Sequence, residues 1–217
     1  MDNPHADAPR SPTLGRVEWD HLFDDLESQL AAEWEAERAA LDAESERLRI
    51  AKLSLRERLR TMTAGASRAA IELSCGERWD CTLRVIGADW IGVSTPDDRR
   101  LRLIPLTAIT GVAVDHGTLL ASLAEGVSDA PGAALRERMT LGFVLRDLAR
   151  RRTPVTLARR DGDPQHGTID RAGVDHLDLA LHDAGDPRRA RAVHGFRIVP
   201  LDALTWVRIE RGDSAAS

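Results

Sequence analysis

The sequence predicts an α+β protein in which a long N-terminal amphipathic helix precedes two tandem units, each a helix followed by a small five-stranded β-barrel. Two observations lead to this prediction. Apolar residues recur at three- and four-residue spacings over residues 18–62, as on one face of a helix, and alternate with polar residues from residue 63. The strand pattern of residues 63–116 then returns over residues 153–210, after a linker and connecting helix at residues 117–152.

The N-terminal helix follows a polar tail, residues 1–17, and a second short tail covers residues 211–217. The acids of the helix lie mostly up to Glu46 and its bases mostly after it, which suits the helix dipole. These charges favour a solvated helix, with antiparallel self-association as the alternative. The apolar stripe is core if the helix lies on the barrels, and otherwise forms a docking surface. Its candidate partner-binding residues are Trp19, Phe23, Leu26, Leu30 and Trp34.

Turn residues divide each barrel into short strands. Gly76 and the two residues after it predict a hairpin, and Gly87 with Asp89 predicts the turn between the second and third strands. About five strands in roughly 45 residues are typical of a small barrel. In the second unit Gly173 and Asp175 return at the same turn, and the Ile-Pro-Leu that closes the fourth strand returns as Val-Pro-Leu.

The composition excludes several classes of protein. A formal net charge of −5 argues against a whole-molecule grip on nucleic acid and leaves room for a local basic patch. No run of eighteen apolar residues and no apolar N-terminal segment occur, so we expect neither a membrane partner nor secretion, and a cytoplasmic location. In that reducing compartment Cys75 and Cys81 are expected to be buried small hydrophobes.

A helix followed by five short strands, with Gly-x-Asp in the turn between strands two and three, resembles the Sm-like or SH3-like small barrel. The chain also resembles an uncharacterised actinobacterial family, sometimes labelled automatically as Fis family transcriptional regulators, which opens with the Trp-Asp-x-Leu-Phe-x-Asp-Leu-Glu of residues 19–27. The Sm-like resemblance implies RNA binding or ring assembly. Where Sm proteins read bases with an Asn this sequence has Asp89 and Asp175, so the fold is expected without the RNA site.

The second unit carries the arginines that are the candidates for binding nucleic acid. Guanidinium groups hold phosphates bidentately, so these residues would form a binding patch if the end of the connecting helix and the loop before residue 193 share one face. Aspartates are interleaved with them, and no Phe or Tyr stacking platform accompanies them. The candidates are Arg150, Arg151, Arg152, Arg159, Arg160, Arg188, Arg189 and Arg191.

No motif in the sequence predicts catalysis. It has no Gly-x-Ser-x-Gly, no P-loop and no pair of histidines at metal-ligand spacing, so we expect no catalytic residue, metal site or cofactor. Two hypotheses remain. The first is a non-catalytic interaction or scaffold protein that binds a protein partner or a second copy through its N-terminal helix. The alternative is a regulator that binds RNA or DNA through the arginines of the second unit.

Overall fold

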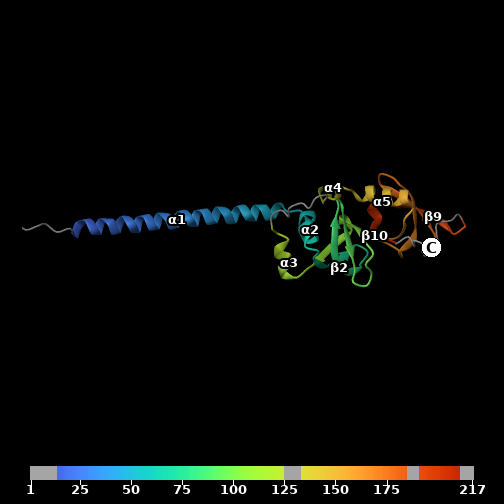
Figure 1. The fold of residues 1–217 in the computed structure, drawn as a ribbon, viewed down its shortest axis with the longest axis horizontal. Coiled ribbons are helices and arrows are strands. Elements are labelled where there is room, and N and C mark those ends of the chain that lie inside the picture. Colours follow the sequence, from blue (N-terminus) through green and yellow to red (C-terminus); the bar gives the residue numbers. More distant parts are fainter. Residues whose placement is uncertain (1–13, 125–132, 185–190, 211–217) are drawn as a thin grey trace, which may run out of the picture. The chain divides into compact units, whose positions relative to one another are not determined.

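The computed structural model describes residues 14–124, 133–184 and 191–210, with side chains from residue 22 onward. The chain divides into two structural units, Met1–Lys52 and Leu53–Ser217 (Figure 1). Within its described residues, 14–52, the first unit is one helix, α1 (Leu14–Lys52). The second unit holds every strand of the described residues and the remaining helices. The α+β class and the long N-terminal helix are therefore confirmed.

The predicted helix over residues 18–62 is divided at Ser54, where a second helix, α2 (Leu55–Ala64), begins. The Ser54 hydroxyl accepts a hydrogen bond from the Glu57 amide at 3.2 Å, and the Glu57 carboxylate accepts one from the Ser54 amide at 2.7 Å. This capping box satisfies backbone donors that an interior helix turn would satisfy with carbonyl groups. The Ser-x-x-Glu pattern is therefore the sequence signal for the break.

The second unit is built on a ten-stranded sheet with the order β5-β1-β2-β3-β4-β10-β6-β7-β8-β9, in which every neighbouring pair is antiparallel. We call β1–β5 the first half of the sheet and β6–β10 the second half. The strands of the first half are β1 (Arg68–Leu73), β2 (Arg78–Ile86), β3 (Trp90–Ser94), β4 (Arg102–Pro105) and β5 (Ile109–Ala113). Those of the second half are β6 (Pro154–Arg159), β7 (Gln165–Ala172), β8 (His176–Leu181), β9 (Gly195–Pro200) and β10 (Leu204–Ile209).

Both halves show the same order, with the last strand beside the first. The same local details recur. The amide of Gly87 donates to the Trp90 carbonyl at 2.8 Å, and the amide of Gly173 donates to the His176 carbonyl at 2.8 Å. One bulge interrupts the pairing of β2 with β3 and another that of β7 with β8. A short 3₁₀ turn precedes the last strand of each half, η1 (Leu106–Ala108) and η2 (Leu201–Ala203).

Three further helices accompany the sheet in the described residues. α3 (His116–Ala121) follows β5, and α4 (Ala133–Glu137) and α5 (Leu141–Arg151) precede β6. The expected connecting helix is therefore split, because the Thr140 hydroxyl accepts from an amide of the first turn of α5 and starts a new helix. α5 buries three leucines against the second half, at every third or fourth residue as an amphipathic helix requires.

The two expected five-stranded units are the two halves of one continuous open sheet and are not clearly two tandem barrels. Two apolar cores lie along it, and each takes residues from both halves. The first core includes Ala158 and Trp206 of the second half, and the second core includes Trp90 and Leu103 of the first half. The cause is the pairing of β4 with β10, in which Leu103 lies opposite Val207. Period-two alternation identifies strands but does not identify which edges will pair.

Candidate functional site

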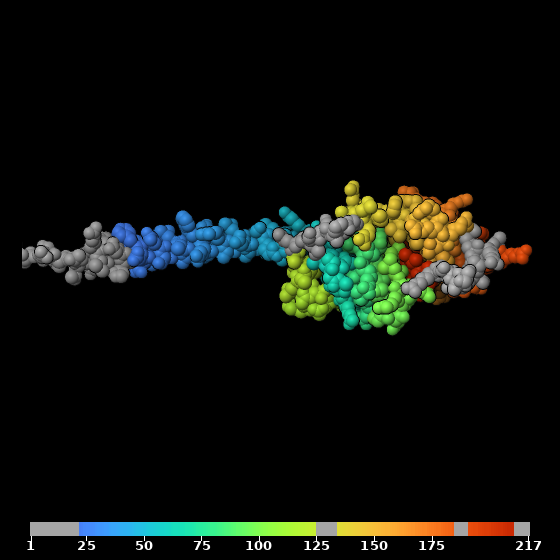
Figure 2. All heavy atoms as spheres, viewed as in Figure 1, coloured from blue at the N-terminus to red at the C-terminus, as the bar shows by residue number. Residues whose placement is uncertain are grey.

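The predicted partner-binding residues lie on α1, and four of them form what we call the helix stripe. It consists of Phe23, Leu26, Leu30 and Trp34. These side chains are between 45 and 63 % exposed (Figure 2, blue). At about 100° per residue they fall within an arc of roughly 80°, so they face the same way. The fifth predicted residue, Trp19, belongs to α1, but its side chain lies outside the described residues.

Acidic residues surround the helix stripe. Between residues 22 and 46, α1 carries nine acids and a single base, Arg38. Bases gather after that, where Arg47 and Arg49 pair with carboxylates one turn earlier at 2.8 and 2.6 Å. A surface that covers the stripe must therefore be apolar in its centre and basic at its margin.

The arginines predicted to bind nucleic acid are divided in the structure into separate groups. Arg150 and Arg151, at the end of α5, share the carboxylate of Asp147 at 2.6 and 2.7 Å. The hydrogen bond from Arg150 holds the pKa of Asp147 below its usual value, so this carboxylate offsets part of their charge. Arg152 ends the helix with a left-handed backbone, at φ 52°. The three residues thus have local structural roles at this helix end.

Arg159 and Arg160 lie at the opposite end of β6 from Arg152. An extended strand of this length separates the two groups by about 20 Å. The pair lines a cavity of about 270 Å³ that it shares with two aspartates. The structure therefore does not bring the helix-end and strand-end arginines together. Of the other candidates, Arg191 is exposed before β9, and Arg188 and Arg189 lie outside the described residues.

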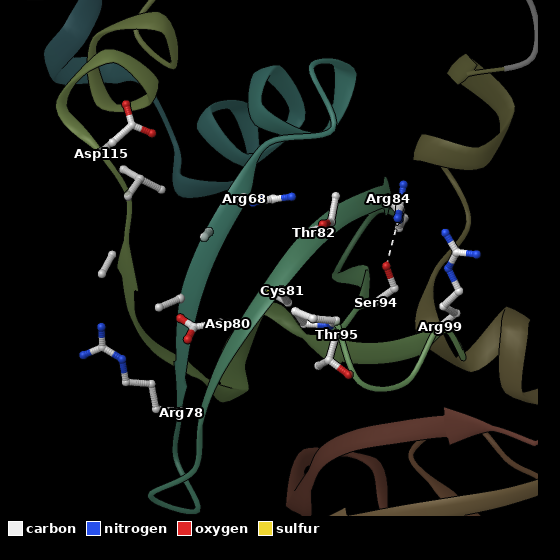
Figure 3. A pocket seen from close by; sticks show the side chains of 15 residues that line it. Arg68, Arg78, Asp80, Cys81, Thr82, Arg84, Ser94, Thr95, Arg99 and Asp115 are labelled. Carbon is white, nitrogen blue, oxygen red and sulfur yellow. Dashed lines mark hydrogen bonds between the residues drawn. The ribbon is translucent and has the colours of Figure 1, made fainter.

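A different cluster of arginines lies on the first half of the sheet, around a basin of about 770 Å³ (Figure 3). None of the predicted site residues lies in it. Two of its arginines, Arg78 and Arg84, project from the same face of β2, as even spacing along a strand requires. This even spacing of arginines along a strand is the signal in the sequence that could have identified the cluster. The arginine basin is lined by Arg68, Arg78, Arg84 and Arg99, with Asp80 and Asp115 among them.

The arginine basin suits an anionic ligand and offers no activated nucleophile. The Arg84 guanidinium donates to the Ser94 hydroxyl at 2.8 Å (Figure 3). Arg78 lies 3.3 Å from the Glu72 carboxylate. Cys81 lies in the floor, and burial raises the pKa of its thiol to about 11, so the thiolate is scarce at neutral pH. Even with Arg78 paired to Glu72, four guanidinium groups face three carboxylates, Asp80, Asp115 and Glu72, so the basin stays positive and matches phosphate or carboxylate oxygens.

A polar cluster lies where the two halves meet. The buried Glu210 carboxylate accepts hydrogen bonds from Thr156 at 2.7 Å and Arg208 at 2.8 Å, and it pairs with Arg100 from the loop before β4. Burial alone would raise the pKa of Glu210, but the hydrogen bonds from Thr156 and Arg208 hold it below its usual value. Because Arg100 comes from the first half, the cluster ties the two halves together.

Two histidines of the second half, His166 and His182, are part of the packing, whereas His176 and His194 are exposed. His182 is buried with its Nε2 atom 2.9 Å from the Thr168 hydroxyl, and the ring of His166 meets it edge-on at 5.1 Å between centroids. Burial lowers the pKa of His166, so the ring is neutral near pH 7. Within the described residues, no group of three or more His, Cys, Asp or Glu could hold a metal ion. In the same part of the chain, no helix has the length and apolar character to cross a membrane.

No known family model matches this chain, and no curated protein or solved structure matches it. The function is therefore inferred from three features of the described residues. The first is the helix stripe, an exposed apolar surface on α1. The second is the arginine basin, a concave basic surface on the first half of the sheet. The third is the pair of outer sheet edges, β5 and β9.

Proposed function

We propose that this protein is a non-catalytic interaction or scaffold protein that binds a second copy or a protein partner through the helix stripe. The supporting observation is that four large apolar side chains share one face of α1 and are at least 45 % exposed. About half of each side chain remains to be covered, so its burial contributes roughly half of the 1.5–3 kcal/mol of a full transfer from water. The four side chains of each of two copies then contribute about 6–12 kcal/mol together, which is comparable with an association cost of about 4–15 kcal/mol.

The charge order of α1 favours an antiparallel second copy. If two helices cross near residue 37, the acidic part of each, where Phe23 and Trp34 lie, meets the basic end of the other, which carries Arg47 and Arg49. Opposite charges would then flank the apolar side chains of the two stripes. A heterologous partner with an apolar groove and a basic margin meets the same requirement.

The test compares two double variants of the full chain by sedimentation velocity. Phe23→Glu with Trp34→Glu places charge on the helix stripe, whereas Ala32→Glu with Ala43→Glu places the same charge on the opposite face of α1. We expect the first variant to associate less than the unaltered chain, because the contact through α1 is lost, and the second to associate as the unaltered chain does. Equal association of both variants with a second copy, and equal co-purification of any partner, would show that the stripe is not the binding surface.

The cytoplasm is the proposed location. Both cysteines of the chain, Cys75 and Cys81, are free in the structure, and one of them is buried. Free thiols of this kind persist in a reducing compartment. The Glu210 cluster holds the two halves of the sheet together, so it supports a structural rather than a catalytic role for these polar groups.

We also propose that each half of the sheet is a small barrel of the Sm-like type, opened where β4 pairs with β10. The shared strand order, the matching bulges and the matching 3₁₀ turns support this. Each half has five short antiparallel strands that curve over one helix, α2 or α5. On this view the two halves are a tandem repeat whose barrels are joined edge to edge.

The alternative function, binding of RNA or DNA, has one observation in its favour, the arginine basin. Its four exposed guanidinium groups lie on one concave face, whereas Arg150 and Arg151 are partly neutralised by Asp147. We therefore move the proposed nucleic-acid surface from the second half to the first. Salt-dependent binding of an oligonucleotide that Arg84→Glu weakens and Arg150→Glu leaves unchanged would support it, and no binding at low salt would refute it.

A further inference from the structure

A joint inside the sheet holds the two halves together, and its strand pairing is well defined. Leu103 of β4 lies opposite Val207 of β10, and the amide of Ile209 donates to the Leu101 carbonyl at 3.0 Å. Leu103 is fully buried and packs in the second core together with residues of α5. In this internal joint, β4 is the edge strand of the first half, and its Leu103 enters the space between β10 and α5 of the second half.

The turn between β2 and β3 adds polar contacts to this joint. The Asp89 carboxylate accepts a hydrogen bond at 2.7 Å from the amide of Leu141, the first residue of α5. The amide of Ala88 and the indole N–H of Trp90 both donate to the Met139 carbonyl, each at 2.9 Å. The turn of the first half thus caps the helix of the second half, and it satisfies a donor that the helix itself cannot.

The second half presents the same parts at the outer edge of the sheet. The turn between β7 and β8 carries Val174, Asp175 and His176, which correspond to Ala88, Asp89 and Trp90 of the first half. These three residues of the second half are exposed, Val174 by 89 %. On β9, Ile198 takes the place of Leu103 in β4, and Phe196 takes the place of Leu101, the residue before β4. Ile198 is 72 % exposed, although its counterpart Leu103 is completely buried. An edge strand with exposed large apolar side chains is a pairing surface.

The first half presents the receiving parts at the opposite edge. Leu55 begins α2 as Leu141 begins α5, yet Leu55 is 47 % exposed and Leu141 only 4 %. A mainly apolar groove of about 230 Å³ lies between α2 and β5, and α3, which packs against α2, borders it. Its apolar lining includes Leu55, Leu59, Met62, Ile109, Val112 and Leu119.

We propose that copies of this chain join head to tail through these two edges, with β9 of one copy paired to β5 of the next as β4 is paired to β10 within the chain. In this joint Ile198 lies opposite Val112 and enters the groove, and Asp175 caps the amide of Leu55. Because the two edges differ, each added copy leaves one of each kind open, so the assembly grows as a filament or closes as a ring. The inference goes beyond the association through α1 and uses no residue of it.

A second copy is the occupant that the structure favours, because the chain already contains one finished example of the contact. Charge agrees with this choice. Arg197 of β9 is the counterpart of Arg102 at the internal joint, and Asp115 follows β5 as Glu210 follows β10. The head-to-tail joint therefore brings a guanidinium and a carboxylate to the same end of the paired strands.

The test uses the full chain with Phe23→Glu and Trp34→Glu in place, so that association through the helix stripe is removed. Mass is measured by light scattering over a series of concentrations. In this background Ile198→Glu alters the β9 edge and Leu55→Glu alters the receiving edge. Because both positions are exposed, we expect both variants to keep the fold, which circular dichroism checks. Phe143→Glu, at an exposed site on α5, is the matched control.

We expect the parent and the control to exceed the mass of one chain, and each edge variant alone to fall to it. Mixed together, the two edge variants still form one intact joint, so they give a dimer and nothing larger. A two-fold contact through one surface would not show this complementation. A parent with the mass of a single chain at every concentration, or a mixture that stays monomeric, would overturn the proposal. Either result leaves the proposal for α1 standing, since its own variant is measured separately.

Discussion

Leu103 and Ile198 occupy corresponding positions in the two halves, and replacing each with alanine separates the effect of burial from that of side-chain type. Leu103 is fully buried in the second core, so Leu103→Ala removes buried methyl groups and leaves a cavity, at a cost of about 2–5 kcal/mol. Ile198 is 72 % exposed, so Ile198→Ala in a dilute monomer changes stability by no more than about 0.5 kcal/mol. For a unit of this size a loss near 3 kcal/mol lowers the Tm by about 6–12 °C.

The assay is urea unfolding at low protein concentration, followed by near-UV and far-UV circular dichroism. Because Leu103 belongs to the first half but packs in the second core, we expect one coincident transition that Leu103→Ala shifts as a whole. The slope of free energy against urea should stay the same in both variants, since the surface exposed on unfolding is unchanged. Two separate transitions within the sheet-bearing unit, of which Leu103→Ala moves only one, would refute a shared core, whereas a separate transition of α1 would not. A loss below about 1 kcal/mol for Leu103→Ala would refute it as well.

Three further outcomes follow from the site geometry. If a nucleic acid occupies the arginine basin, Arg84→Glu should lower the slope of log K against log salt by about 0.7 for a single strand, while Arg150→Glu leaves it unchanged. The hydrogen-bonded Glu210 has a pKa below its usual value, so its contribution to stability should be present at neutral pH and disappear as the pH falls through that lowered pKa; acid titration of Glu210→Gln should show a flatter profile. Burial and a thiol pKa of about 11 should make Cys81 react with a disulfide reagent far more slowly than Cys75 in the native state, and at a similar rate in urea.

Much of the secondary structure could be predicted because it depends on local pattern. The helical spacing from Phe23 to Trp34 and the period-two alternation of the strands are visible in the sequence and hold in the structure. Gly87 and Gly173 mark the expected turns in both halves. The division of the long helix at Ser54 could also have been predicted, since a capping box is a local signal.

The joining of the two halves could not be predicted, because it depends on contacts between distant segments. Leu103 has the same alternating pattern as its counterpart Ile198, yet one is buried and the other exposed. Nothing local distinguishes them, since the difference lies in which strand edge each meets. The nucleic-acid candidates failed to come together for a related reason. Arg152 and Arg159 are near in sequence, but an extended strand holds them apart.

The capping box at Ser54 has a consequence for how this chain can be altered. Ser54, the N-cap of α2, and Glu57 in its first turn accept the hydrogen bonds from each other's backbone amides. No residue of α1 takes part in these two hydrogen bonds. The junction at Leu53 is thus a site where α1 could be lengthened, shortened or exchanged for another helix without removing a backbone partner from the rest. The chain is in this respect modular, with one exchangeable part and one part whose two halves depend on each other.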